Sequence, residues 1–182
     1  AYLYRHKNVW TLFEGAQGAL LDIDTGSYPF VSSGMSCAAG AAAQGGIGLR
    51  RVDRILGVFK AYTTRVGNGP FPTEFADDSP GSLSNFIRTT GNEYGVTTGR
   101  PRRCGYLDLV ALRYAVRVNG ISSIALTKLD VLTGQERIPV CTSYMVEGQD
   151  EPHFPCALQR LEKASPHYEY LEGWHEDIAS CT

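Results

Sequence analysis

A short polar segment at residues 96–105 concentrates the side chains best suited to bind a small anion. It reads Val-Thr-Thr-Gly-Arg-Pro-Arg-Arg-Cys-Gly, so two threonine hydroxyls stand beside three guanidinium groups. Guanidinium groups bind carboxylates and phosphates through paired hydrogen bonds and stay charged at any working pH. Gly99 lets the backbone approach a ligand closely. These residue types are consistent with an anion-binding loop or with a solvated basic turn.

A second polar group, Thr127-Lys128-Leu129-Asp130, directly follows an apolar run. If that run is a buried strand, these residues lie at the carboxyl end of a sheet, where α/β sheets bind ligands. The Asp130 carboxylate can accept hydrogen bonds from both N1–H and the exocyclic amine of guanine, a donor pair that adenine lacks. The pattern resembles the T/N-K-x-D base-recognition element of guanine-nucleotide proteins. A solvated lysine and aspartate at a strand end is the alternative.

Two glycine-bearing segments near the start of the chain carry further polar groups. In Glu14-Gly-Ala-Gln-Gly18 the amide of Gln17 both donates and accepts, which suits the polar edge of a neutral base. A structural turn is the alternative. Asp22 and Asp24 alternate, as a metal-binding or acid–base pair on a strand would, but Gly26 and the Tyr-Pro that follows favour a structural loop.

Composition and charge argue against a nucleic-acid-binding, membrane-spanning or metal-binding protein. The chain has 182 residues, which favours a single domain over residues 1–182, and its net charge of -2 provides no general attraction to nucleic acid. It contains no apolar run near the ~20 residues that span a bilayer. The five cysteines form no C-x-x-C pair, and the histidines lack metal-ligand spacing. We therefore expect a cytoplasmic protein that binds neither membrane nor nucleic acid. Because no Met begins the chain, we also expect a piece of a longer protein.

Hydrophobic patterning predicts the elements that position these groups. We expect buried strands at 9–14, 55–63, 121–126 and 138–146, and an edge strand at 168–171. Residues 38–43 could begin a helix, 82–90 fit a short helix, and 107–118 form an amphipathic helix that Asn119-Gly120 would end. Strands separated by helices and long crossovers favour an α/β fold with a mainly parallel, covered central sheet and flanking helices.

Several motifs in one order resemble a known family. They are Glu14-Gly-Ala-Gln-Gly-Ala-Leu-Leu-Asp-Ile-Asp24, Tyr28-Pro-Phe-Val31, Arg65-Val-Gly-Asn-Gly-Pro-Phe-Pro-Thr-Glu74, Gly91-Asn-Glu-Tyr-Gly95, Thr97-Thr-Gly-Arg100 and Leu126-Thr-Lys-Leu-Asp130. From about residue 9 to at least residue 174 the chain resembles the adenylosuccinate synthetases. The resemblance implies a ligase that joins IMP and L-aspartate with GTP hydrolysis, giving adenylosuccinate, GDP and phosphate in purine biosynthesis. It also implies a homodimer, Mg²⁺, and a fold related to P-loop GTPases.

The resemblance assigns the site residues by substrate. The implied IMP-binding residues are Gln17, Ser32, Val66, Gly67 and Arg100, where Gln17 would also stabilise the 6-oxygen as the catalytic residue and Ser32 replaces a usual Thr at a phosphate contact. The implied aspartate-binding residues are Thr97, Thr98, Arg100 and Arg102. The implied GTP-binding residues are Arg102, Lys128, Leu129 and Asp130. Pro101 departs from the Arg that is common in the family.

Other parts of the family's site have no counterpart in this sequence. Its glycine-rich phosphate loop, catalytic Asp and His, the Mg²⁺ ligands and an arginine given across the dimer would precede residue 1, and the segment covering guanine would follow Thr182. The resemblance therefore predicts a fragment that is inactive alone and holds no metal. The alternative is a non-catalytic guanine-nucleotide-binding or regulatory module.

Overall fold

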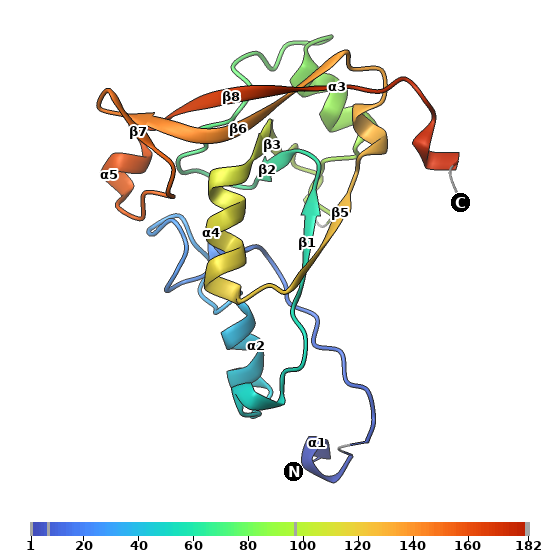
Figure 1. The fold of residues 1–182 in the computed structure, drawn as a ribbon, viewed down its shortest axis with the longest axis vertical. Helices are drawn as coiled ribbons and strands as arrows, with labels where there is room; N and C mark the ends of the chain where they lie inside the picture. Colours follow the sequence, from blue (N-terminus) through green and yellow to red (C-terminus); the bar gives the residue numbers. More distant parts are fainter. Residues whose placement is uncertain (1, 7, 97, 181–182) are drawn as a thin grey trace.

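The computed structural model describes residues 2–6, 8–96 and 98–180, which form a mixed α/β fold (Figure 1). The helices are α1 (Tyr2–Arg5), α2 (Ala38–Gln44), α3 (Leu83–Thr90), α4 (Leu109–Asn119) and α5 (Leu158–Leu161). The strands are β1 (Leu56–Lys60), β2 (Thr63–Arg65), β3 (Arg103–Gly105), β4 (Leu107–Asp108), β5 (Ser123–Thr127), β6 (Arg137–Val146), β7 (Gln149–Glu151) and β8 (Ser165–Glu172). Single 3-10 turns are η1 (Ala19–Leu21), η2 (Leu49–Arg51), η3 (Asp130–Leu132) and η4 (Ile178–Ser180).

β1 and β5 form a parallel pair that confirms two of the expected strands with shifted bounds. Leu56 lies opposite Ser123, and Lys60 lies opposite Thr127. The expected burial on both faces is wrong here, because the pair leaves a set of apolar side chains exposed: Leu56, Val58, Ile124 and Leu126. Among the described strands nothing else pairs with β1 or β5. Burial of an apolar strand needs a covering layer as well as an apolar sequence.

The expected single strand at 55–63 divides in two. After β1 the chain turns inward at Ala61 and Tyr62, both buried, and continues as β2, which pairs antiparallel with β3. A separate sheet is built on β6, which pairs parallel with β4 and antiparallel with β7 and β8. The strand expected at 138–146 is confirmed. The expected edge strand at 168–171 is also present, and β8 extends it in both directions. The α/β class is confirmed, and parallel and antiparallel pairing occur together.

Local signals explain where the two longest helices begin and end. The Ser82 side chain caps α3 by accepting a hydrogen bond from the Asn85 N–H at 3.2 Å. Asp108 caps α4 in the same way through the Ala111 N–H at 3.0 Å. Gly120, at φ 62°, adopts the left-handed conformation that ends α4. The helix predicted at 107–118 therefore begins two residues later, since residues 107 and 108 first pair with β6 as β4.

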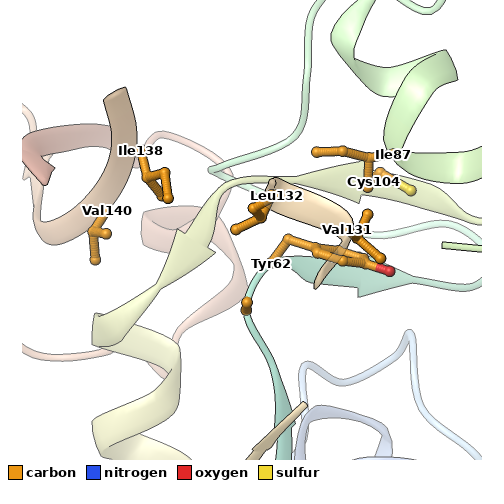
Figure 2. Close-up of a cluster of buried hydrophobic side chains, with 8 residues drawn as sticks. Tyr62, Ile87, Cys104, Val131, Leu132, Ile138 and Val140 are labelled. Atoms are coloured by element: carbon orange, nitrogen blue, oxygen red, sulfur yellow. The ribbon is translucent and has the colours of Figure 1, made fainter. Parts of the chain in front are cut away.

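Two apolar clusters hold the elements together. The first joins the turn between β1 and β2 to α3, β3, η3 and β6 through Ala61, Tyr62, Ile87, Cys104, Val131, Leu132, Ile138 and Val140 (Figure 2). The second packs α4 against β6 and the segment around α5, through Val110, Tyr114, Cys141, Tyr144, Val146, Phe154 and Leu161. The first cluster lies beside the ends of β1 and β5, so it fixes the segments that carry the polar motifs.

The strand predicted at 9–14 is wrong. These residues run as an extended arm without a strand partner among the described residues, and the Trp10 side chain is 99% exposed (Figure 1). A β-ladder needs a neighbour to accept and donate its backbone hydrogen bonds, and an apolar sequence cannot supply one. In the described part of the chain, no helix has the length and apolar character needed to cross a membrane.

Candidate functional site

Polar residues gather where β1 and β5 end. Lys60 is the last residue of β1, and Thr127, the last of β5, donates its hydroxyl to the Phe59 carbonyl at 2.8 Å. Lys128 follows at φ 62°, a left-handed conformation that turns the chain away from the sheet. Leu129 packs against the first apolar cluster, and Asp130 is exposed at the start of η3. The partly buried leucine thus anchors a turn that presents the aspartate to solvent.

The arginine segment lies across a short bridge from the Gly91–Gly95 turn. Tyr94 pairs with Pro101, and the Gly95 N–H donates to the Arg100 carbonyl at 2.8 Å. Gly99 has φ 64°, which a residue with a side chain rarely adopts. The Thr98 and Arg100 side chains are exposed. Thr97 lies outside the described residues.

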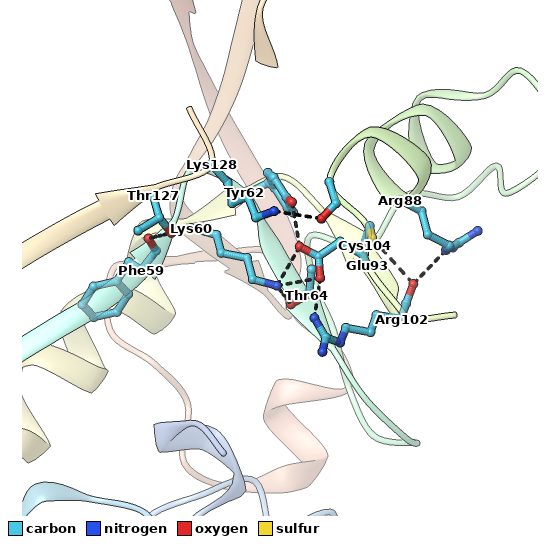
Figure 3. Close-up of polar contacts among 11 residues, drawn as sticks. Phe59, Lys60, Tyr62, Thr64, Arg88, Glu93, Arg102, Cys104, Thr127 and Lys128 are labelled. Atoms are coloured by element: carbon cyan, nitrogen blue, oxygen red, sulfur yellow. Dashed lines mark hydrogen bonds and ion pairs between the residues drawn. The ribbon is translucent and has the colours of Figure 1, made fainter. Parts of the chain in front are cut away.

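A buried carboxylate, Glu93, gathers three donors from this region (Figure 3). Lys60 Nζ lies 2.7 Å from Oε2, Arg102 Nη1 lies 2.7 Å from the same oxygen, and the Tyr62 hydroxyl donates to Oε1 at 2.7 Å. Burial alone would raise the pKa of Glu93, but these three hydrogen bonds outweigh it and lower the pKa. Glu93 is therefore an anion, and it fixes two cations beside the end of β1.

Arg103 links the arginine segment to the glycine loop at residues 66–69. Its guanidinium pairs with Glu74, with Nε 2.7 Å from Oε1, and Nη1 donates to the carbonyls of Gly67 and Gly69 at 3.1 and 2.9 Å. Val66 is exposed beside them. The glycine loop predicted to contact IMP and the arginine segment predicted to contact IMP, aspartate and GTP are thus held side by side.

Arg65 joins that glycine loop to the loop that carries Ser32. Its Nη2 donates to the Ser27 hydroxyl at 2.8 Å and to the Phe30 carbonyl at 3.2 Å, while Nε donates to the Asn68 carbonyl at 3.2 Å. Burial, and to a lesser degree the nearby charge of Arg103, lowers the pKa of Arg65. A buried cation held by neutral acceptors therefore underlies this part of the site.

The turn around Asp22 fixes the remaining candidates. The Asp22 carboxylate, 2% exposed, accepts hydrogen bonds from the backbone of Asp24, Thr25 and Cys37. The Ser32 hydroxyl donates to the carbonyl of Leu21, the residue before Asp22, at 2.9 Å. This supports the structural-loop interpretation of Asp22.

Gln17 lies in the turn that precedes this loop. It is exposed at φ 59°, and its neighbour Gly18 accepts a hydrogen bond from Ser36 at 3.0 Å. That bond ties the Gln17 turn to the loop that carries Ser32.

Comparison with known proteins identifies the family. The family model for adenylosuccinate synthetase matches residues 2–182. The chain belongs to the adenylosuccinate synthetase family. Adenylosuccinate synthetases of Caldanaerobacter subterraneus and Moorella thermoacetica are each 56% identical over 92% of this chain, but that match covers only 38% of each relative. The chain is thus a fragment relative to these proteins. A solved structure of fully ligated adenylosuccinate synthetase from Plasmodium falciparum matches 93% of this chain and 40% of its own, with 42% identity and a TM-score of 0.86.

The described residues of this family member do not fit a magnesium site. No three His, Cys, Asp or Glu side chains in residues 2–6, 8–96 and 98–180 are grouped so that they could hold a metal ion. The polar groups at the ends of β1 and β5 are mainly cationic, whereas Mg²⁺ prefers carboxylate and phosphate oxygens.

Glu93 and Arg65 organise the site but were not among the sequence-based candidates, and Arg103 was counted only as one of the three guanidinium groups at residues 96–105. All three lie within or beside motifs shared with adenylosuccinate synthetases, and motif membership was the available signal. Their partners are distant in sequence, as in the pairing of Lys60 with Glu93 and of Arg65 with Ser27.

Proposed function

We propose that the full-length protein containing this chain is an adenylosuccinate synthetase, joining IMP and L-aspartate with GTP hydrolysis. The observation that carries the proposal is that the Thr127–Asp130 turn and the arginine segment both contact the Gly91–Gly95 turn. Lys128 Nζ donates to the Gly91 carbonyl at 3.0 Å, and Glu93 of the same short turn holds Arg102. A base-recognition turn beside an anion-binding segment suits a reaction that brings a guanine nucleotide to an anionic second substrate.

GTP would bind at the turn after β5. The exposed Asp130 carboxylate accepts from N1–H and the exocyclic amine of guanine, and the Lys128 stem lies along the purine face. Leu129 contributes by packing against the first apolar cluster, which fixes the turn. Arg102 reaches the phosphate side of the nucleotide, where a guanidinium can bind oxygen anions bidentately.

IMP and aspartate would meet on the other side of the arginine segment. Ser32 contacts the IMP phosphate, Val66 and Gly67 line the pocket, and Gln17 holds the 6-oxygen of the base. Arg100 contacts both IMP and aspartate. The aspartate carboxylates also accept hydrogen bonds from Thr97, Thr98 and Arg102. In the reaction the GTP γ-phosphoryl group is transferred to the IMP 6-oxygen. The aspartate amine then forms a bond to C6, and the C6–O bond breaks with release of phosphate.

The residues of this chain bind and orient the reactants, a contribution that can be worth several kcal/mol of a barrier. The general base and acid, the Mg²⁺ ligands and the phosphate loop are proposed to lie in the rest of the protein. The active form is proposed to be a cytoplasmic homodimer, and residues 1–182 alone are expected to be inactive.

The test is direct assay of the full-length protein with IMP, aspartate and GTP. We expect adenylosuccinate to form only when all three are present, with one GDP and one phosphate released per product. Equilibrium binding of GTP is measured in parallel. GTP binding without any product formation would instead favour the non-catalytic nucleotide-binding module.

A further inference from the structure

The Gly91–Gly95 turn has contacts that the assigned roles do not explain. Glu93 is 1% exposed, yet it carries a charge, and burial of an ion is costly unless its partners are well placed. Replacing buried ion pairs by apolar residues is often neutral or stabilising, so stability alone is a weak explanation for such a group. The residues that Glu93 contacts give a better explanation for its burial as an ion.

Arg102 is restrained through both its backbone and its side chain. Its backbone N–H donates to the Glu93 carbonyl at 2.9 Å, and its own carbonyl accepts from Arg88 Nε at 3.0 Å. Arg88 is in turn paired with Asp78 at 2.6 Å. With the backbone fixed from two sides, the direction of the guanidinium depends on the 2.7 Å bond to the Glu93 carboxylate.

The same turn contacts the base-recognition element. Lys128 donates to the Gly91 carbonyl two residues before Glu93, and Lys60, from the end of β1, is the second cation on the carboxylate (Figure 3). One carboxylate between two cations leaves a net positive charge. Both Lys60 and Arg102 keep 28% of their side chains exposed. The Lys60 ammonium uses its three donors on the two Glu93 oxygens and on the Thr64 hydroxyl at 2.9 Å, so the donor positions open to a ligand anion are those of the Arg102 guanidinium.

We propose that Glu93 is a positioning residue, which holds the Arg102 guanidinium in the direction that receives an anionic group of the substrates, with Lys60 as a second cation beside it. The inference rests on the proposed function, because it assigns to the same site the group that orients its arginine. The ligand group is an oxygen anion, a phosphate of the nucleotide or a carboxylate of aspartate. A guanidinium displaced by about 1 Å can cost on the order of 100-fold in rate.

The experiment is a double-mutant cycle in the full-length protein, with kcat/KM for aspartate and for GTP measured separately. Its variants are Glu93→Gln, Arg102→Leu and the double variant. We expect Glu93→Gln to lower kcat/KM for aspartate by about 10- to 100-fold. The double variant should be no slower than Arg102→Leu alone, because the two residues act as one unit. Glu147→Gln, which breaks an exposed pair with Lys163 at 2.6 Å, is the matched control and should leave the rate unchanged.

The outcomes separate the two proposals. Multiplied losses in the double variant, with both single variants folded, overturn the positioning role while leaving the proposed function intact. An inactive wild type overturns the proposed function itself. If Glu93→Gln does not fold, as judged by its thermal melt, Glu93→Asp replaces it in the same cycle. Full activity of a folded Glu93→Gln or Glu93→Asp variant would also refute the inference.

Discussion

Substituting Asp22 by Asn should loosen the loop that carries Ser32. In the structure the Asp22 oxygens accept four hydrogen bonds, from the N–H groups of Asp24, Thr25 and Cys37 and from the Thr25 hydroxyl. An asparagine supplies only one acceptor oxygen, so its amide nitrogen must face a backbone N–H in either orientation. The substitution therefore removes the charge and also turns the amide nitrogen towards at least one backbone donor, the Cys37 N–H in the more favourable orientation.

The pKa of Asp22 gives the size of the effect. Burial alone would raise it, but the hydrogen bonds outweigh burial and lower the pKa from 3.8 to about 2. At 1.36 kcal/mol per pKa unit, the ionised carboxylate stabilises the folded loop by about 2 kcal/mol at neutral pH. Because the folded pKa is depressed, this stabilisation is present above the unfolded value near 4 and is lost as pH falls towards 2.

Hydrogen exchange of the full-length protein measures the effect locally. At pH 7 we expect the peptide spanning residues 19–38 to exchange roughly 30-fold faster in Asp22→Asn, which corresponds to about 2 kcal/mol. Asp24→Asn, an exposed neighbour of the same type, should exchange as the wild type does. KM for IMP should rise with the Asp22 variant, since Ser32 is held by the Leu21 carbonyl. Equal exchange in the two variants would refute the reasoning.

Three further substitutions in the full-length protein test the assigned contacts. Asp130→Asn removes a charged acceptor, and the loss of about 1.5–3 kcal/mol should raise KM for GTP tenfold or more; an unchanged KM for GTP would exclude Asp130 from the base site. Arg100→Lys keeps the charge but loses the paired donors, so KM for aspartate should rise about tenfold, with a smaller change for GTP. If KM for aspartate keeps its wild-type value, the segment does not clamp aspartate. Gly69→Ala places a Cβ 2.6 Å from Arg65 Nη2 and should raise KM for IMP about tenfold. Gly134→Ala has a similar φ but no neighbour within 4 Å, so an equal change in KM for IMP there would contradict the steric explanation.

The parts of the fold that were predictable depend on neighbours in sequence. Asn119-Gly120 predicted the end of α4 from adjacent residues, and the patterns of β6 and β8 were sufficient to locate those strands. Residues 9–14 were misassigned because the apolar sequence pattern is the same whether or not another segment pairs with it or covers it. The outer face of β1 and β5 was misjudged for the same reason.

The same distinction, between contacts with neighbours in sequence and contacts with distant segments, applies to the candidate site. The polar turn at Asp130 and the arginines around Arg100 could be recognised from contiguous residues. Glu93 could not, since its importance comes from Lys60 at the end of β1 and from Arg102, which belong to other segments. The same holds for Arg65, whose partners Ser27 and Phe30 belong to a distant loop.

The parallel pairing of β1 with β5 also has a consequence for synthesis on the ribosome. Leu56 meets Ser123 only after the whole intervening segment has been made, and at about 5–20 residues per second this takes several seconds. During that interval β1 has neither its β5 ladder nor any other described strand beside it. An unpaired apolar strand is a template for association with other chains. The nascent chain should therefore be a chaperone client at this stage, until Thr127 has emerged and the polar ends of both strands come together.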